Sequence, residues 1–269
     1  MHLSNVPVLE LVSERPGRPL VLLHGWGCDA RYWDRLIPKL ELRGYEVWIA
    51  AAPGYTKDST SVPKSEDYFA VAADRLGSEL YRRFTNPVDV VAHSMGVYIA
   101  CVVASTKPQV LNSLTMLSIV PDPPPQKNSN PAVNELLSTG YLSYDTAQRC
   151  VTNWYGGEAL DPEQQNEFVS ALQQMPVETL LASAEACTLG LDAGVLDSVQ
   201  SKIHVIVGTN DKARSVDDIK AYVASQPDRE VRFIDNAGHM PHWSHPNDLA
   251  DAMHAYIEKS AVSLNGSHS

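Results

Sequence analysis

The sequence is poor in cysteine and has no spacing of cysteines that suggests a metal site. Four cysteines in 269 residues are too few for a disulfide framework in a chain of this length, and no pair has the spacing of a zinc knuckle. We interpret them as small buried hydrophobic residues of a reducing compartment. The sequence therefore predicts neither a disulfide scaffold nor a bound metal. The cysteines are Cys28, Cys101, Cys150 and Cys187.

Positive charge and long apolar runs are also scarce. Lys and Arg number 21 against 32 Asp and Glu, so the net charge is −11. A strongly acidic protein repels phosphate backbones and anionic bilayers, which disfavours nucleic acid and membranes as partners. The apolar runs are too short to span a bilayer, and residues 1–10 lack the features of a signal peptide. We therefore expect a cytoplasmic protein whose partner is a small molecule.

What the sequence does contain is a regular alternation of strand-like and helix-like segments. The short apolar runs suit strands that are buried on both faces, and the segments between them have helical periodicity. This alternation predicts an α/β fold with a mostly parallel central sheet flanked by helices. The expected strands are 19–24, 45–51, 88–92, 114–120, 203–208 and 231–234, and the expected helices are 30–43, 65–84, 215–226 and 246–259.

One stretch, residues 121–190, breaks the alternation. It opens with a proline-rich turn and continues with helix-like segments at 132–138, 143–155, 161–175 and 177–189, without a strand. We interpret it as a helical cap, or lid, inserted into the core after strand six. The core would then consist of residues 1–120 and 191–259, and the polar residues 260–269 would form a flexible tail.

A serine stands where an expected strand meets an expected helix, in His93-Ser94-Met95-Gly96. A nucleophilic serine on such a tight turn needs small residues two positions before and two positions after it. Here those residues are Ala92 and Gly96, so the motif is an A-x-S-x-G variant of the usual glycine pattern. The turn predicts that Ser94 is a catalytic nucleophile.

A serine hydroxyl needs a base to accept its proton. His239 lies in a Gly-His turn directly after an expected strand, which favours it over His242 and His245 of the same loop. We interpret the two rivals as loop or helix-capping residues.

The base in turn needs a carboxylate to orient its ring. Asp211 also follows a strand, and the chain order Ser, Asp, His is the one expected for this architecture. The competing acid, Asp122, is better explained as a turn residue among prolines.

Acyl transfer also requires donors for the negative charge that develops on the carbonyl oxygen. Two backbone amides are candidates, that of Met95, next to the nucleophile, and that of Trp26 in the turn Gly25-Trp26-Gly27. If the sheet is arranged as expected, both amides lie at neighbouring strand ends.

Taken together, these motifs resemble those of the α/β-hydrolases over residues 6–259, and the opening motif and the helical segment are similar to those of the pimeloyl-carrier-protein methyl ester esterases. The resemblance implies a Ser94–His239–Asp211 triad, an oxyanion hole from Trp26 and Met95, and no cofactor. The motifs that carry it are His24-Gly25-Trp26-Gly27, Pro53-Gly54-Tyr55, Ala92-His93-Ser94-Met95-Gly96, Gly208-Thr209-Asn210-Asp211 and Gly238-His239-Met240-Pro241.

The charge of the expected cap argues against a carrier-protein substrate. Residues 121–190 contain two basic and nine acidic residues, a balance of −7, and would repel an acidic acyl carrier protein. We therefore expect a small, neutral or cationic substrate. Apolar residues suggest a substrate pocket, although at helical spacing simple packing is the more common role. The candidates are Trp26, Trp154, Tyr155, Phe168 and Met175.

The sequence thus predicts a serine hydrolase that cleaves a small, neutral, largely apolar carboxylic ester or thioester through an acyl-enzyme on Ser94. The alternative is the same fold and triad used for carbon–carbon bond hydrolysis, lyase chemistry or cofactor-free ring-cleaving dioxygenation. Similar dioxygenases carry an extra histidine where this chain has Met95. A third, less favoured possibility is a ligand-binding protein without catalysis.

Overall fold

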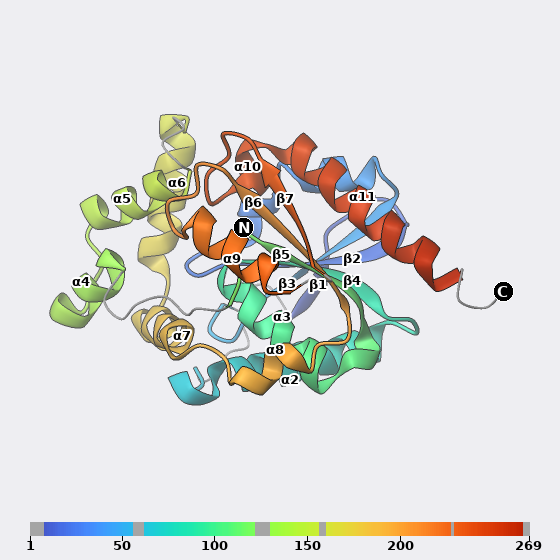
Figure 1. Ribbon diagram of the computed structural model, residues 1–269. Helices are drawn as coiled ribbons and strands as arrows, with labels where there is room; N and C mark the ends of the chain where they lie inside the picture. The colour runs from blue at the N-terminus through green and yellow to red at the C-terminus, as the bar shows by residue number, and fades with distance from the viewer. Residues whose placement is uncertain (1–7, 56–61, 122–129, 156–159, 227–228, 266–269) are drawn as a thin grey trace.

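A seven-stranded sheet forms the centre of the computed structural model, which describes residues 8–55, 62–121, 130–155, 160–226 and 229–265 (Figure 1). The strand order is β1-β3-β2-β4-β5-β6-β7, and every neighbouring pair is parallel except β1 and β3. The predicted mostly parallel α/β class is confirmed. The strands are β1 Leu9–Leu11, β2 Arg18–Leu23, β3 Tyr45–Ala50, β4 Val88–His93, β5 Leu111–Leu117, β6 Lys202–Gly208 and β7 Glu230–Ile234.

The apolar runs become strands because helices cover both faces of the sheet. Along β2, Val21 and Leu23 belong to one apolar cluster, whereas Leu20 and Leu22 belong to a second cluster on the opposite face. Helices α2 Tyr68–Arg83, α3 Met95–Thr106, α8 Ala193–Asp197 and α9 Val216–Ala224 lie on the first face, and α1 Ile37–Glu41 and α11 Pro246–Asn265 on the second (Figure 1). Short helical turns occur at η2 Ala30–Trp33, η3 Ser65–Asp67, η4 Pro108–Val110 and α10 Pro241–Ser244.

Four helices lie between β5 and β6, where the sequence indicated a helical insertion. They are α4 Pro131–Thr139, α5 Tyr144–Trp154, α6 Pro162–Gln174 and α7 Val177–Leu189, called the inserted helices below. Three of them begin at a side-chain cap, since Asn130, Ser143 and Asp161 each accept a hydrogen bond from an amide of the first turn. Figure 1 shows the inserted helices to one side of the sheet, and β5 and β6 remain direct neighbours.

Several bounds differ from the sequence-based expectations, including those of β5 (expected at 114–120) and of the expected helix 30–43, which is divided into η2 and α1. Three further differences concern the organisation of the chain. The three-residue strand β1 was missed, because only Leu9 of its residues is buried and such a short run has no visible periodicity. The strand before the inserted helices is the fifth of the described strands and not the sixth, because only β1 precedes β2. Helix α11 continues to Asn265 instead of ending near Lys259, since no glycine or proline interrupts residues 247–265. Residues 260–265 are therefore helical and not a flexible tail.

No helix within the described ranges combines the length and the apolar character that crossing a bilayer requires.

Candidate active site

The turn between β4 and α3 places Ser94 in a strained backbone conformation. Its φ of 49° and ψ of −119° lie in a region that residues with a side chain seldom adopt. The turn is tight because a Cβ on Gly96 would lie 2.7 Å from the carbonyl oxygen of His24, and Ala92 is fully buried. This packing explains the small residues on both sides of the serine. It also raises the Ser94 hydroxyl above the end of the sheet.

His239 connects Ser94 to Asp211 through two hydrogen bonds. The Ser94 Oγ lies 3.0 Å from Nε2 of His239, and Nδ1 of His239 lies 2.8 Å from Oδ2 of Asp211. The carboxylate accepts a hydrogen bond from Nδ1–H, which leaves the unprotonated Nε2 able to accept the serine proton. The structure therefore brings together the three residues that the sequence singled out.

The carboxylate of Asp211 is fixed from behind by the loop that follows β6. Its Oδ1 accepts hydrogen bonds from the amides of Ala213 and Arg214, at 2.8 and 3.3 Å. The side chain is completely shielded from solvent. The two amides fix the orientation of the carboxylate, so that its Oδ2 faces Nδ1 of His239.

The two candidate oxyanion donors lie beside the nucleophile. A Cβ added to Gly25 would be only 3.1 Å from Cβ of Ser94, so the turn that carries Trp26 touches the serine. Within the described ranges, neither the Trp26 nor the Met95 amide donates a hydrogen bond. Both residues line the cavity at Ser94. Two free amides at this position suit a developing negative charge.

The histidine of the same turn is structural. Nε2 of His24 accepts a hydrogen bond from the Ala52 amide at 3.1 Å, and Nδ1 donates to the Gly25 carbonyl at 2.8 Å. Burial lowers the pKa of His24, which keeps the ring in this neutral form. The ring therefore joins the ends of β2 and β3 and holds the turn in place.

The rival residues do not reach the nucleophile. His242 is buried behind the site against Trp33, with ring centroids 4.4 Å apart. His245 lies 2.8 Å from the hydroxyl of its neighbour Ser244. Asp122, the competing acid, lies outside the described residues.

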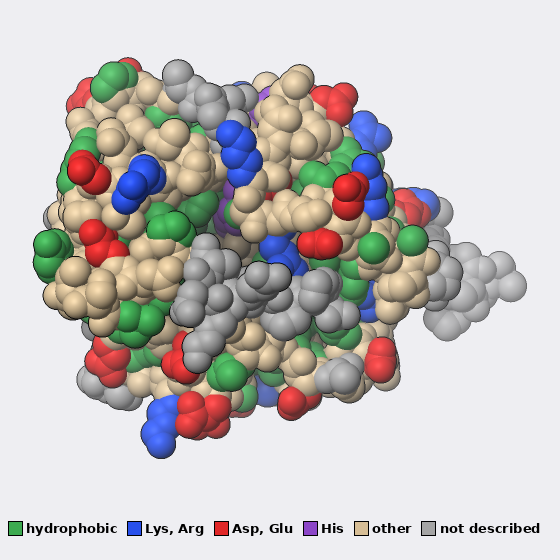
Figure 2. Space-filling model, turned by 60° about the vertical axis from the view of Figure 1, so that its left-hand side comes forward, with side chains coloured by type: hydrophobic (Ala, Val, Ile, Leu, Met, Phe, Trp, Pro, Cys, Tyr) green, Lys and Arg blue, Asp and Glu red, His purple; other side chains and the backbone are tan. Residues whose placement is uncertain are grey.

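A cavity of about 810 Å³ opens in front of Ser94 and is lined by both the sheet edge and the inserted helices. Figure 2 shows a hollow on this face, with a histidine inside it and hydrophobic side chains on its walls. Among the described lining residues the charged side chains are Glu185, Lys212 and Arg214. Of the described acidic residues of the inserted helices, only Glu185 faces the cavity. The acidity of this segment therefore belongs mainly to its outer surface.

Two of the five candidate pocket residues, Trp26 and Trp154, line the cavity, with ring centroids 6.3 Å apart. The other three do not line it, which corrects the expectation for Tyr155, Phe168 and Met175. Phe168 instead stacks on Tyr32 at 4.3 Å, and all three are at least 95% buried in the main apolar cluster. Their helical spacing therefore reflects packing against the core and not a role in the cavity wall.

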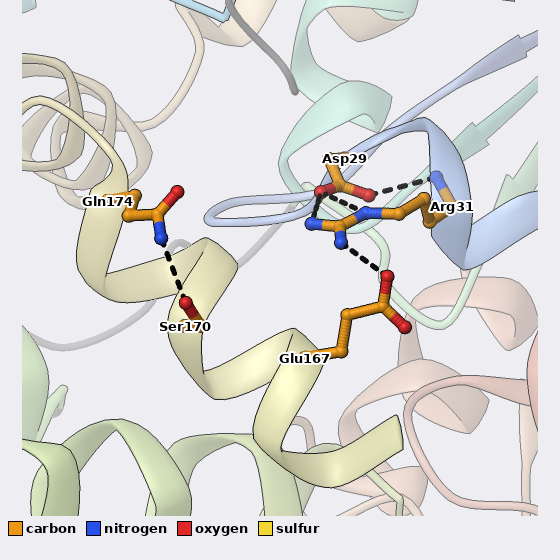
Figure 3. A network of polar contacts seen from close by, with 5 residues as sticks. All are labelled: Asp29, Arg31, Glu167, Ser170 and Gln174. Carbon is orange, nitrogen blue, oxygen red and sulfur yellow. Dashed lines mark hydrogen bonds and ion pairs between the residues drawn. The ribbon is translucent and has the colours of Figure 1, made fainter. Parts of the chain in front are cut away.

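Polar contacts join the inserted helices to the loop after β2. Arg31 donates to Asp29 of its own loop and, at 2.7 Å, to Glu167 of α6 (Figure 3). The Trp26 indole N–H donates to the Leu180 carbonyl of α7 at 2.9 Å. The loop that supplies a candidate oxyanion donor is thus also a contact surface for α6 and α7.

Sequence reasoning missed several cavity residues. His93 was read only as part of the serine motif, and the cysteines only as buried hydrophobic residues, although Cys28, Cys150 and Cys187 line the cavity as free thiols. The position of His93 directly before the nucleophile was a usable signal. The cysteines carried no such signal, because tertiary packing decides which of them reach the cavity. The described residues contain no cluster of three or more His, Cys, Asp or Glu suited to a metal ion.

Comparison with known proteins identifies the family. A model of the alpha/beta hydrolase family matches residues 20–252. The chain belongs to the alpha/beta hydrolase family. It is therefore an enzyme, and the carboxyl ends of its strands bring Ser94, His239 and Asp211 into one hydrogen-bonded series.

The relatives agree with the resemblance seen in the sequence. The chain is 26% identical to the biotin biosynthesis bifunctional protein BioHC of Teredinibacter turnerae, over 96% of this chain and 49% of that protein, so it spans about half of that relative. It is 27% identical to the pimeloyl-[acyl-carrier protein] methyl ester esterase of Aromatoleum aromaticum, over 86% and 94% of the two chains. Among solved structures, the bromoperoxidase of Bacillus anthracis superposes with a TM-score of 0.81 at 16% identity, covering 96% and 98%.

Proposed function

We propose that this protein is a serine esterase that cleaves a small, largely apolar carboxylic ester or thioester through an acyl-enzyme on Ser94. The observation that carries the proposal is the continuous hydrogen-bonded relay from Ser94 through His239 to Asp211, at 3.0 and 2.8 Å. Relatives that are named methyl ester esterases support the same reaction class.

In the proposed reaction the Ser94 oxygen attacks the ester carbonyl while Nε2 of His239 takes the hydroxyl proton. The carbonyl oxygen becomes an oxyanion, which the amides of Trp26 and Met95 stabilise. Protonated His239 then delivers the proton to the departing alcohol or thiol, and the acyl group stays on Ser94. A water molecule, deprotonated by His239, releases the acid and restores the serine. Asp211 keeps the imidazole in the required tautomer throughout.

The cavity supports a small substrate with an apolar acyl group. Trp26, Met95, Tyr98, Ile119 and Trp154 give its wall an apolar character close to Ser94. We retain the prediction of a neutral substrate rather than a carrier protein, because acidic side chains dominate the outer face of the inserted segment. A size ladder of p-nitrophenyl esters, acetate to octanoate, would measure how much acyl chain the cavity accepts.

Turnover of that ladder by the wild type and by Ser94→Ala tests the proposal. The wild type is expected to hydrolyse the short and medium esters, and Ser94→Ala to lose at least about 10⁴-fold in kcat. Ester cleavage that survives in Ser94→Ala would contradict the proposal. Oxygen uptake or carbon–carbon cleavage without any ester hydrolysis would favour the alternative chemistry on the same fold.

A further inference from the structure

The side chain directly before the nucleophile, His93, contacts the backbone of the proposed general base, His239. His93 is the last residue of β4 and is 1% exposed. Its Nε2 lies 2.9 Å from the backbone carbonyl oxygen of His239. A carbonyl can only accept, so this nitrogen carries the proton and donates it. One side chain therefore joins the strand that ends at Ser94 to the loop that carries the base.

The ring of His93 has no room to turn away from that bond. On one side, a Cβ on Gly25 would lie 2.6 Å from Nδ1 of His93. On the others, the rings of His239 and His242 have centroids 4.9 and 4.6 Å away, and Trp33 meets the ring edge-on. Packing thus locks the direction in which Nε2 points.

Burial and the neighbouring histidines also keep His93 neutral. Burial, and then the nearby rings of His242 and His239, lower its pKa well below the usual value. Since Nε2 carries the only proton of the neutral ring, Nδ1 is an acceptor, and among the described residues it has no hydrogen-bond partner. Burying a polar atom without a hydrogen-bond partner destabilises the folded state. The orientation of the His93 ring is therefore set by another contact, the hydrogen bond from Nε2.

We infer that His93 is a positioning residue that sets the distance between Ser94 and His239 by donating from Nε2 to the His239 carbonyl. The Ser94 hydroxyl is held by β4, and the base by the loop after β7, two segments 145 residues apart in sequence. Without the bond, the His239 side chain keeps its contacts to Asp211 and Ser94, but the backbone of its loop loses its hydrogen bond to β4. The inference rests on the proposed function, because it assigns a role within that relay.

The test is a series of three substitutions that differ in where they place a donor. In His93→Gln the amide nitrogen occupies the place of Nε2 and can reach the carbonyl, whereas in His93→Asn it occupies the place of Nδ1 and cannot. His93→Phe keeps a ring without a donor. The control is His242→Gln, which perturbs the same buried cluster but leaves the bond intact. Rates are expressed per active site, counted by a fluorophosphonate probe.

We expect His93→Asn and His93→Phe to lose roughly 10- to 100-fold in kcat with KM nearly unchanged, because the base is displaced while the cavity is not. His93→Gln should stay within about threefold of the wild type, and the rate constant of fluorophosphonate labelling should follow the same order. The inference would be overturned if His93→Gln lost as much kcat as His93→Phe. It would also be overturned if neither His93→Asn nor His93→Phe lost any. An equal loss in His242→Gln would do the same.

A measurement on the wild type does not depend on the variants folding. The nitrogen chemical shifts of His93 report which ring nitrogen carries the proton, and the inference requires Nε2–H. A proton on Nδ1 would overturn it. Loss of ester turnover in Ser94→Ala together with full activity in His93→Asn would refute the role of His93 alone, whereas unchanged turnover in Ser94→Ala would refute the proposed function itself.

Discussion

The sheet edge and the inserted helices make different contributions to one cavity. The sheet edge supplies the relay, in which each side chain follows a strand and is fixed by backbone geometry, as in the turn at Ser94. The inserted helices supply apolar wall and hold it by packing, as where Phe168 stacks on Tyr32. In the proposed function, the positions at strand ends set the chemistry, and the way the inserted helices lie against them sets the fit of the substrate. Substitutions at the sheet edge should lower the reaction rate, whereas packing substitutions in the inserted helices should lower the stability of the fold.

The largest effect is expected for the carboxylate at the sheet edge. Asp211→Asn offers an amide to Nδ1 of His239, which favours the tautomer that cannot accept the serine proton. We expect kcat to fall by roughly 10³- to 10⁴-fold with little change in the unfolding midpoint. Steady-state kinetics and thermal unfolding of the purified variant measure both quantities. An activity loss that merely follows a loss of folded protein would contradict the division between the regions.

A packing residue of the inserted helices should show the opposite pattern. Phe168→Ala removes a ring that stacks on Tyr32 and meets Trp243 edge-on, and should cost about 3–5 kcal/mol in the free energy of unfolding. Because Phe168 does not line the cavity, kcat/KM of the folded fraction should change little. The matched variant Trp154→Ala alters the cavity wall and should raise KM for longer acyl chains. An equal rise in KM for longer acyl chains in Phe168→Ala and Trp154→Ala would contradict the distinction between packing residues and cavity residues.

The contact between the serine and the turn that carries Trp26 can be tested by a single methyl group. Gly25→Ala places a Cβ 2.6 Å from Nδ1 of His93 and 3.1 Å from Cβ of Ser94, so the turn must shift. We expect roughly 100-fold lower kcat and a destabilisation of about 1–3 kcal/mol. Gly194→Ala is the control, since its added Cβ meets no atom within 4 Å. Wild-type kinetics in Gly25→Ala would show that the turn is not part of the site.

The effect that is smallest at neutral pH concerns the buried histidine behind the site, His242. Burial lowers the pKa of His242 to about 3 from 6.5. Between these pH values His242 binds a proton in the unfolded chain but not in the folded chain. Its contribution to the free energy of unfolding is therefore fully present above pH 6.5 and is lost as the pH falls toward 3. The loss is about 1.4 kcal/mol per pH unit. His242→Gln should reduce the slope of the unfolding free energy against pH by the amount that corresponds to the binding of about one proton. Urea denaturation at a series of pH values measures this slope. An unchanged slope would show that His242 titrates normally.

Much of the fold and the relay could be predicted because both depend on local patterns. Continuous apolar runs such as that of β4 mark strands buried on both faces, and parallel strands bring their carboxyl ends to one edge. Ser94 and Asp211 stand shortly after such runs, and His239 follows the alternating strand β7, which is why position along the chain was informative. The helical insertion between β5 and β6 was predicted for the same local reason, since residues 132–189 contain helix-like segments and no strand.

The cavity wall could not be predicted, because tertiary packing decides it. Phe168 and Trp154 have similar chemistry and both stand on amphipathic helices, yet only Trp154 faces the cavity. The side that each helix presents depends on partners such as Tyr32, which is more than 100 residues away in sequence. The charge balance of residues 121–190 is likewise a sum over a segment, and it does not reveal that Glu185 alone of the described acids on the inserted helices lines the cavity.

The most direct test of the account is to locate the nucleophile chemically. The wild type is treated with a fluorophosphonate probe, and the modified peptide is identified by mass spectrometry, with Ser94→Ala and His239→Ala treated in parallel. The account predicts one adduct, on Ser94, that is absent in Ser94→Ala and forms far more slowly in His239→Ala. Labelling at another residue, or undiminished labelling of either variant, would contradict it.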